Sequence, residues 1–223
     1  MKRASSESSN GAGGRRERIL EAAGKVFRAQ GYDASMDDIA AEADVAKQTL
    51  YNQFGSKEEL FRTLIGDRSR ALRAPLMDVA HSAEPRVVLM SLAREYYALG
   101  LTAKGIDFMR MVISLSGRFP EMARDFYEIG PGKTLAALVQ WIEGEVRLGR
   151  LSVADPKLAA EHFLSMILGH VQIRGLLNVG RVLPEREIER RAAYCADAFL
   201  KAHAAQGVNS PTKIGSRQRL TQA

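Results

Sequence analysis

The chain has 223 residues, a formal net charge of +6, a sequence pI near 9.6 and one cysteine, Cys195. A chain of this length buries a core without covalent cross-links, and a single cysteine excludes an intrachain disulfide framework or a zinc site of several cysteines. The basic balance permits a polyanionic partner. No apolar stretch approaches the roughly 18 residues of a membrane span and no secretory leader is visible, so we expect a cytoplasmic protein without a membrane partner.

The two ends of the chain differ in composition from the rest. Residues 1–14 are rich in Ser, Gly and Asn, and residues 205–223 are basic and lack helical periodicity, so both are predicted to be disordered. Between them, apolar residues recur three or four positions apart, as in the stripes Ile19–Phe27 and Leu60–Ile65. Because no alternation of period two accompanies them, the predicted fold class is all-α.

Helix-start signals and a break divide the chain into two predicted domains. Ser35 with Asp38, and Ser56 with Glu59, have the spacing of capping boxes. The N-terminal domain is predicted over residues 15–74, with helices at about 15–30, 36–43, 46–54 and 57–74. After Ala74-Pro75 a larger C-terminal domain is predicted over residues 75–204, with helices at about 85–103, 105–117, 121–148 with an interruption at 130–132, 156–178 and 185–204.

Residues 35–54 have the length pattern of a helix-turn-helix: a short helix, a tight turn at Asp44-Val45 and a second short helix. In the second helix, Val45, Leu50 and Phe54 share one face and are predicted to pack inward. The opposite face and its border hold Lys47, Gln48, Thr49, Tyr51 and Asn52, with no acidic residue among them.

These side chains are of the kinds that contact DNA. Lysine donates to guanine, glutamine and asparagine pair with the adenine edge, and the hydroxyls of Thr49 and Tyr51 reach phosphate oxygens. The next helix begins at Ser56-Lys57, where free backbone N–H groups and the Lys57 charge form a phosphate seat. Each residue taken singly also suits a solvated helix face, but their grouping predicts double-stranded DNA as a partner.

Residues 15–65 resemble the DNA-binding domain of the tetracycline-repressor (TetR) family. The resemblance implies a ligand-responsive transcriptional repressor that binds a palindromic operator as a homodimer and is released by a small-molecule effector. It also places the helix at 46–54 in the major groove and Ser35 and Met36 beside the DNA backbone. The motifs that carry it are Ile19–Phe27, Gly31-Tyr32, Asp38-Ile39-Ala40, Thr49-Leu50-Tyr51, Phe54 and Lys57-Glu58-Glu59-Leu60.

The chain departs from the family pattern at three places. The segment between Gly31 and Ile39 is one residue shorter than usual, which alters the connection between the first two helices. Asp44 replaces the usual glycine of the turn, a position where aspartate tolerates a left-handed conformation. Ala46 stands where serine or threonine is common, so one phosphate contact of the family is missing.

Residues 118–132 and 149–163 are similar to the C-terminal domain of the AefR-like branch of this family. The resemblance implies dimerisation through the last two long helices. Their apolar stripes suit a four-helix interface, and they equally suit the core of a monomer. The predicted interface residues are Leu164, Ile167, Leu168, Val171, Ile188, Ala192, Cys195 and Phe199.

An effector pocket is predicted among the helices between residues 90 and 175. Methionine, aromatic and histidine side chains there are its candidate lining, although the same side chains also serve as ordinary core. Because few fixed charges occur among them, they favour an apolar or aromatic effector. The candidates are Tyr97, Phe108, Met109, Met111, Trp141, Met166 and His170.

The sequence holds no recognisable catalytic motif. HExxH, GxSxG, a P-loop and a dinucleotide fingerprint are all missing, and the adjacent Glu161 and His162 point about 100 degrees apart on a helix. The four histidines are scattered, so neither a metal site nor a cofactor is expected. A helical ligand carrier is the main alternative, and the acid-free DNA-type face of residues 46–54 distinguishes the regulator from it.

Overall fold

A computed structural model describes residues 7–77, 84–180 and 183–205. Within these ranges the chain is helical and contains no strand, only an isolated bridge between Leu151 and Ala204, so the predicted all-α class is confirmed. No helix in the described ranges is long and apolar enough to cross a membrane. The elements are α1 (Glu7–Gln30), α2 (Met36–Glu42), α3 (Lys47–Phe54), α4 (Lys57–Met77), α5 (Pro85–Glu95), η1 (Tyr96–Gly100), α6 (Ala103–Leu115), α7 (Pro120–Ile129), α8 (Pro131–Arg147), α9 (Pro156–Leu176) and α10 (Glu185–His203).

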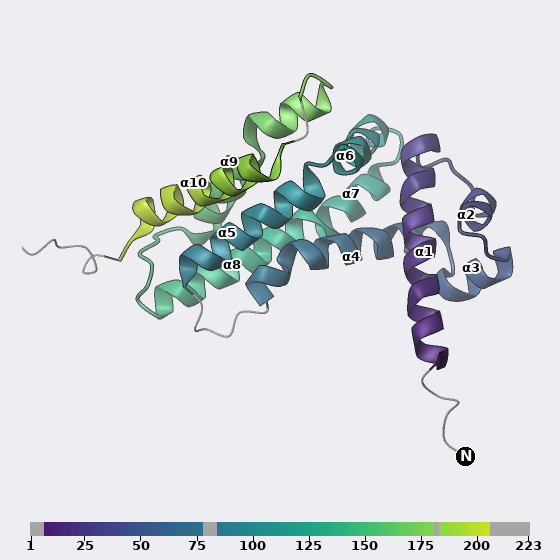
Figure 1. The fold of residues 1–223 in the computed structure, drawn as a ribbon, viewed down its shortest axis with the longest axis horizontal. Helices are drawn as coiled ribbons and strands as arrows, with labels where there is room; N and C mark the ends of the chain where they lie inside the picture. Colours follow the sequence, from purple (N-terminus) through teal and green to yellow (C-terminus); the bar gives the residue numbers. More distant parts are fainter. Residues whose placement is uncertain (1–6, 78–83, 181–182, 206–223) are drawn as a thin grey trace, which may run out of the picture.

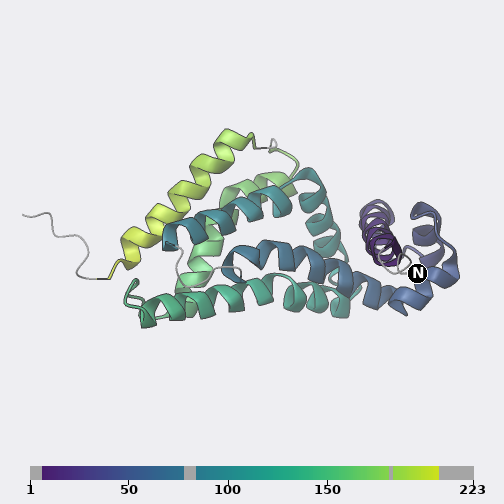
Figure 2. The same cartoon turned by 60° about the horizontal axis from the view of Figure 1, so that its bottom comes forward.

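The molecule is elongated, with α2 and α3 at one end (Figure 1). Helix α1 packs against α2, α4 and α6, and α4 continues from this end into the larger domain, where it packs against α5, α7 and α8. Helices α9 and α10 lie on the far side of that domain, and α10 packs along α5 (Figure 2). Helix α4 is thus the continuous element that joins the two ends.

Local hydrogen bonds explain where several helices begin. The Asp38 amide donates to Ser35 Oγ at 3.1 Å and the Ser35 amide donates to the Asp38 carboxylate at 3.0 Å, which confirms the first capping box. At α4, the Glu59 amide donates to Ser56 Oγ at 3.1 Å. The two helix starts of the helix-turn-helix region are therefore fixed by neighbouring residues.

Two helix ends differ from the prediction. Helix α1 begins at Glu7, so residues 7–14, predicted to be disordered, are helical; an established helix extends by one hydrogen bond per added residue. Helix α4 passes through Pro75 and ends at Met77, because a proline in the last turn removes only the hydrogen bond to Ala71. Residues 1–6 and 206–223, which were also predicted to be disordered, lie outside the described residues.

Two clusters of buried side chains form the core, and the first of them crosses the predicted domain boundary. The first joins α1–α4 but also includes Phe108, Met111 and Val112 of α6 and Met122 of α7. The second lies among α5, α8, α9 and α10. Since α6 and α7 complete the core around the helix-turn-helix, the predicted boundary at residues 74 and 75 does not separate two independent cores.

Candidate DNA-binding site and effector cavity

The turn between α2 and α3 has the geometry that the sequence predicts for Asp44. Its φ is 52°, in the left-handed region. The Asp44 amide donates to the Ala41 carbonyl at 3.2 Å and the Val45 amide to the Ala40 carbonyl at 3.0 Å. This is the Schellman pattern of hydrogen bonds, with aspartate in the place that glycine usually takes. Val45 then packs against the first cluster, which fixes the direction in which α3 leaves the turn.

Helix α3 presents a polar face to solvent. Leu50 and Phe54 are buried, as predicted. The exposed residues of this face are Lys47, Gln48, Tyr51 and Asn52, and Thr49 at its border is half-buried. The Gln48 amide nitrogen donates to Asn52 Oδ1 at 2.8 Å, so these two side chains are held in one orientation. Ala46 caps α3 without a side-chain hydrogen bond, as expected from its missing hydroxyl.

The surface around α3 is not free of acid, which corrects the sequence prediction. Asp37, in the first turn of α2, lies 2.8 Å from the Lys47 ammonium and accepts its hydrogen bond. This hydrogen bond, followed by the charge of Asp37, raises the pKa of Lys47. The Lys47 ammonium also lies 5.9 Å from the centroid of the Tyr51 ring. The sequence segment 45–57 is acid-free, but the fold brings a carboxylate from the preceding helix to its edge.

The predicted backbone-contacting residues differ in their surroundings. Ser35 is exposed, and its hydroxyl donates to Asp38 at 2.6 Å, which lowers the pKa of that carboxyl. The Met36 side chain is 7% exposed and packs in the first cluster, so the predicted position of Met36 beside the DNA backbone does not rest on its side chain. The Lys57 ammonium donates to the Tyr32 carbonyl at 2.7 Å and lies 4.8 Å from the centroid of its ring.

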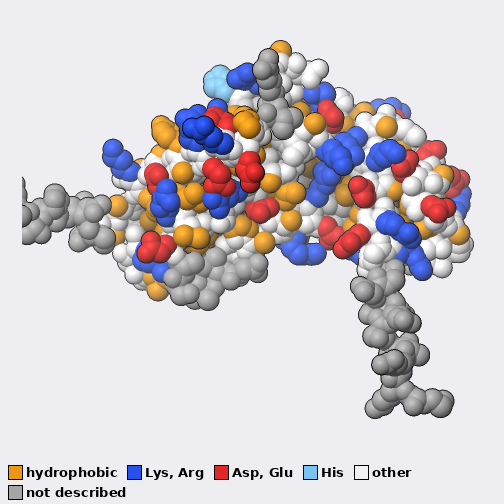
Figure 3. Space-filling model, in the orientation of Figure 1, with side chains coloured by type: hydrophobic (Ala, Val, Ile, Leu, Met, Phe, Trp, Pro, Cys, Tyr) orange, Lys and Arg blue, Asp and Glu red, His pale blue; other side chains and the backbone are white. Residues whose placement is uncertain are grey.

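The basic excess of the chain is not gathered in one patch on the face seen in Figure 3. Lysine and arginine side chains are spread over both ends of the molecule and alternate with acidic ones. Attraction to a polyanion therefore depends on local groups, such as those of α3 and the start of α4.

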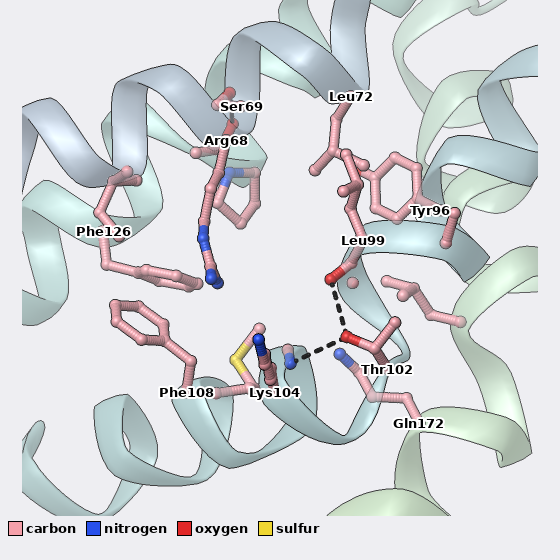
Figure 4. Close-up of a pocket in the computed structure, with 18 of the residues that line it drawn as sticks. Arg68, Ser69, Leu72, Tyr96, Leu99, Thr102, Lys104, Phe108, Phe126 and Gln172 are labelled. Carbon is pink, nitrogen blue, oxygen red and sulfur yellow. Dashed lines mark hydrogen bonds between the residues drawn. The ribbon is translucent and has the colours of Figure 1, made fainter. Parts of the chain in front are cut away.

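A cavity of about 700 Å³ lies between α4, η1, α6, the α7–α8 junction and α9 (Figure 4). The π-helical turn η1 forms part of its wall, with the Leu101 amide donating to the Tyr96 carbonyl at 3.2 Å. The lining is mainly apolar, with two cationic side chains. It consists of Ile65, Arg68, Ser69, Leu72, Tyr96, Ala98, Leu99, Gly100, Thr102, Ala103, Lys104, Gly105, Phe108, Met109, Phe126, Gly130, Pro131, Leu164, Leu168 and Gln172.

Only two of the predicted pocket residues, Phe108 and Met109, line this cavity. The other five lie elsewhere. They were predicted from residue type, which does not reveal which side of a helix faces the cavity. On α9, Leu164, Leu168 and Gln172 face it at intervals of four residues. Two of these five residues, Met166 and His170, are exposed to solvent. The other three pack in the core, and they are Tyr97, Met111 and Trp141.

The residues of the predicted dimer interface lie in the core of the single chain or line its cavity. Ile167, Ala192, Cys195 and Phe199 are at most 4% exposed within the single chain, so they cannot contact a second copy. Val171 and Ile188 pack against the same cluster, while Leu164 and Leu168 line the cavity. The stripes thus belong to the core of one chain. The large apolar side chains that α9 and α10 expose are Leu158, Met166, Ile173 and Tyr194.

A solvent-facing polar helix after a tight turn, joined to a helical domain with a cavity, defines the class of helix-turn-helix transcription regulators. Comparison with protein families agrees. Residues 19–64 match the model of bacterial regulatory proteins of the tetR family, and residues 87–205 match the C-terminal domain of AefR-like transcriptional repressors. The chain belongs to the TetR family, whose members and fold are those of transcription regulators and not of enzymes.

Solved structures resemble the chain over most of its length. A protein of Mesorhizobium loti MAFF303099 described as a TetR-family transcriptional regulator is 27% identical, with a TM-score of 0.72, over 85% of this chain and 96% of its own. The flavonoid-responsive regulator FrrA is 36% identical, with a TM-score of 0.66, over 87% of this chain and 99% of its own. The similarity to each of these two structures therefore extends through both domains of the present chain.

Curated relatives match a shorter segment. The HTH-type transcriptional regulators TtgW and SrpR, both of Pseudomonas putida, are each 37% identical over 79 residues. That segment is 34% of this chain, and it spans 59% of TtgW and 37% of SrpR. The match therefore concerns about a third of the chain.

Proposed function

We propose that this protein is a ligand-responsive repressor that binds a palindromic operator as a homodimer and is released by a small-molecule effector. The observation that carries the proposal is the course of α4. Its first residue, Lys57, lies beside the helix-turn-helix, while Arg68, Ser69 and Leu72 on the same helix line the cavity. An occupant that shifts α4 would move the two recognition helices of a dimer relative to one another.

In this proposal α3 enters the major groove and the start of α4 meets the phosphate backbone. Lys47, Gln48, Thr49, Tyr51 and Asn52 would contact the bases and nearby phosphates, with Ser35 and Lys57 at the backbone. Since Lys47 is paired with Asp37 in the free protein, docking exchanges that ion pair for a contact with DNA. The exchange reduces the net binding free energy that Lys47 contributes, so Asp37 lowers the affinity for DNA.

A second copy of the chain is proposed to cover the exposed apolar residues of α9 and α10. Met166 and Ile173 lie on either side of a kink at Gly169 in α9, and they are 41% and 51% exposed; Tyr194 on α10 is 72% exposed. Exposed side chains of this size suit an interface between identical surfaces. A two-fold dimer would present two α3 helices to two half-sites of a palindrome.

The cavity is proposed as the effector site. FrrA, which is 36% identical, is flavonoid-responsive, and the wall of this cavity includes Phe108 and Phe126 among many aliphatic groups. The Phe108 ring also stacks on Phe61 at 5.9 Å between centroids, and Phe61 contacts the Phe27 and Tyr32 rings. An occupant that displaces Phe108 thus acts directly on the core beneath the helix-turn-helix. The effector releases DNA only to the extent that it prefers the unbound arrangement.

Fluorescence anisotropy with the DNA upstream of the gene, in the presence of unrelated competitor, tests the DNA-binding half of the proposal. Tyr51→Ala should weaken operator binding by about 10- to 100-fold, the range of one lost hydrogen bond to a charged phosphate. Tyr127→Ala on α7, which also removes an exposed tyrosine, should leave it unchanged. Equal affinities for operator and competitor in the wild-type protein would favour a ligand carrier instead, and size-exclusion chromatography with light scattering tests the dimer.

A further inference from the structure

The cavity wall carries positive charge without a matching negative one. Among the described residues that line it, Arg68 and Lys104 are cationic and none is acidic. The Tyr96 phenol is neutral near pH 7, because burial raises its pKa to about 12. A neutral occupant would therefore leave the partly buried Arg68 guanidinium facing a mostly apolar wall without an anionic partner, which is an unfavourable arrangement.

Arg68 stands apart from the other arginines of α4. Arg62 and Arg70 each form an ion pair, at 3.5 and 3.1 Å. Arg68 makes no hydrogen bond or ion pair with any residue that the structure describes, and its guanidinium carbon lies 5.5 Å from the centroid of the Phe108 ring. Figure 4 shows the Arg68 side chain extending from α4 into the cavity. Its free donors are thus directed at the space that an occupant would fill.

The environment of Arg68 disfavours a lone positive charge. Burial, and then the charge of Arg28, lower the pKa of Arg68. Arginine nevertheless stays protonated in proteins, so the charge remains and its donors need an acceptor. A guanidinium group binds two oxygens of a carboxylate or sulfonate side by side, and such charge-assisted bonds are about twice as strong as neutral ones.

We propose that the effector is an organic anion, with an apolar body and one acidic group. The acidic group would pair with Arg68, and the body would lie against leucine side chains such as Leu72, Leu99 and Leu168. Exposed Lys104 adds positive charge to the same wall. This inference rests on the proposed function, since it takes the cavity to be the effector site.

A pair of fluorescent probes of nearly the same shape tests the charge requirement. The anionic probe is 1-anilinonaphthalene-8-sulfonate and the neutral one is N-phenyl-1-naphthylamine, which lacks the sulfonate. Titration of the full chain should give at least about tenfold tighter binding of the anion, as expected for one charge-assisted pair. Leu168→Trp, which fills the cavity, should abolish the binding of both probes and so locate them.

Arg68→Met and its matched control separate the role of the charge from that of folding. Arg68→Met should weaken the anion by about 10- to 100-fold and leave the neutral probe unchanged. Arg70→Met, two residues along the same helix and outside the cavity, should change neither. Circular dichroism of each variant confirms that it is folded.

The possible failures are distinguishable. Equal wild-type affinities for the two probes, or an Arg68→Met variant that keeps its affinity for the anion, would overturn the anion proposal. If both probes bound the cavity equally and released operator DNA, the effector site would stand while its charge preference would be refuted. If neither probe entered the cavity, the anion proposal would fail, while operator binding in the anisotropy titration would decide the proposed DNA-binding function separately.

Discussion

Lys57 is held within the protein at the place where we expect it to contact DNA. Its ammonium donates to the Tyr32 carbonyl at 2.7 Å and lies 4.8 Å from the centroid of that ring. An ammonium group has three donors, so one is used and two remain for a phosphate. We predict that Lys57→Met lowers both the stability of the chain and the salt dependence of DNA binding.

The size of the stability loss follows from the two internal contacts. A hydrogen bond to a charged group contributes about 1.5–3 kcal/mol, and a cation–π contact at an accessible site about 0.5–1 kcal/mol. Because Lys57 is only half-buried and methionine keeps the aliphatic packing, we expect a net loss of about 1–2 kcal/mol. For a chain of this size the melting temperature should fall by about 2–8 °C.

The lost phosphate contact has its own readout. Each contact contributes about −0.9 to the slope of log K against log salt concentration, so a dimer that loses two should flatten the slope by about 1.8. Anisotropy titrations at several salt concentrations measure this, with Lys133→Met, an exposed lysine on α8, as the control. A lower melting temperature with an unchanged slope would refute the phosphate contact and leave Lys57 with a structural role alone.

Three further predictions address the cavity and the larger domain. Gly105→Ala should lower the melting temperature and disturb probe binding, since its Cβ would lie 2.6 Å from the Leu99 carbonyl oxygen; Gly117→Ala, in open space, should do neither. Phe108→Ala should cost about 3–5 kcal/mol in urea denaturation, because the ring is 3% exposed, and a loss below about 1 kcal/mol would contradict this. Hydrogen bonds from neighbouring arginines, chiefly Arg190, lower the pKa of Glu187 from 4.5 to about 2. The stability that Glu187 adds to the folded chain is therefore present above pH 4.5 and is lost as the pH falls through 2. Glu187→Gln should flatten that part of the plot of melting temperature against pH, and identical plots for the two proteins would contradict this.

The helix-turn-helix was predictable because its determinants are local. The Ser35 capping box, the left-handed Asp44 and the inward face of Leu50 and Phe54 each depend on residues a few positions apart. The boundaries of α2 and α3 accordingly differ from the prediction by one residue at most. The direction of the Met36 side chain was not predictable in this way, because packing within the first cluster decides it.

Contacts between segments that are far apart in the sequence were not predicted from it. Asp37 lies ten positions before Lys47, and only the angle between α2 and α3 brings them together. The cavity is made by one side of α4, α6 and α9, and periodicity alone does not say which apolar stripe faces a cavity and which faces the core. Arg68 was a usable signal, because it lies four residues from both Leu64 and Leu72 on the apolar stripe of α4, where an arginine needs an anionic or aromatic neighbour.

The first cluster of buried side chains limits how this protein can be divided. Phe108, Met111 and Val112 come from α6 and Met122 from α7, yet they pack in one core with α1 and α4. A fragment that stopped at residue 77 would lose one wall of its core. A chimeric regulator that joins this helix-turn-helix to the sensing domain of another protein must therefore retain these four side chains, or equivalents of the same volume, to keep its DNA-binding end folded.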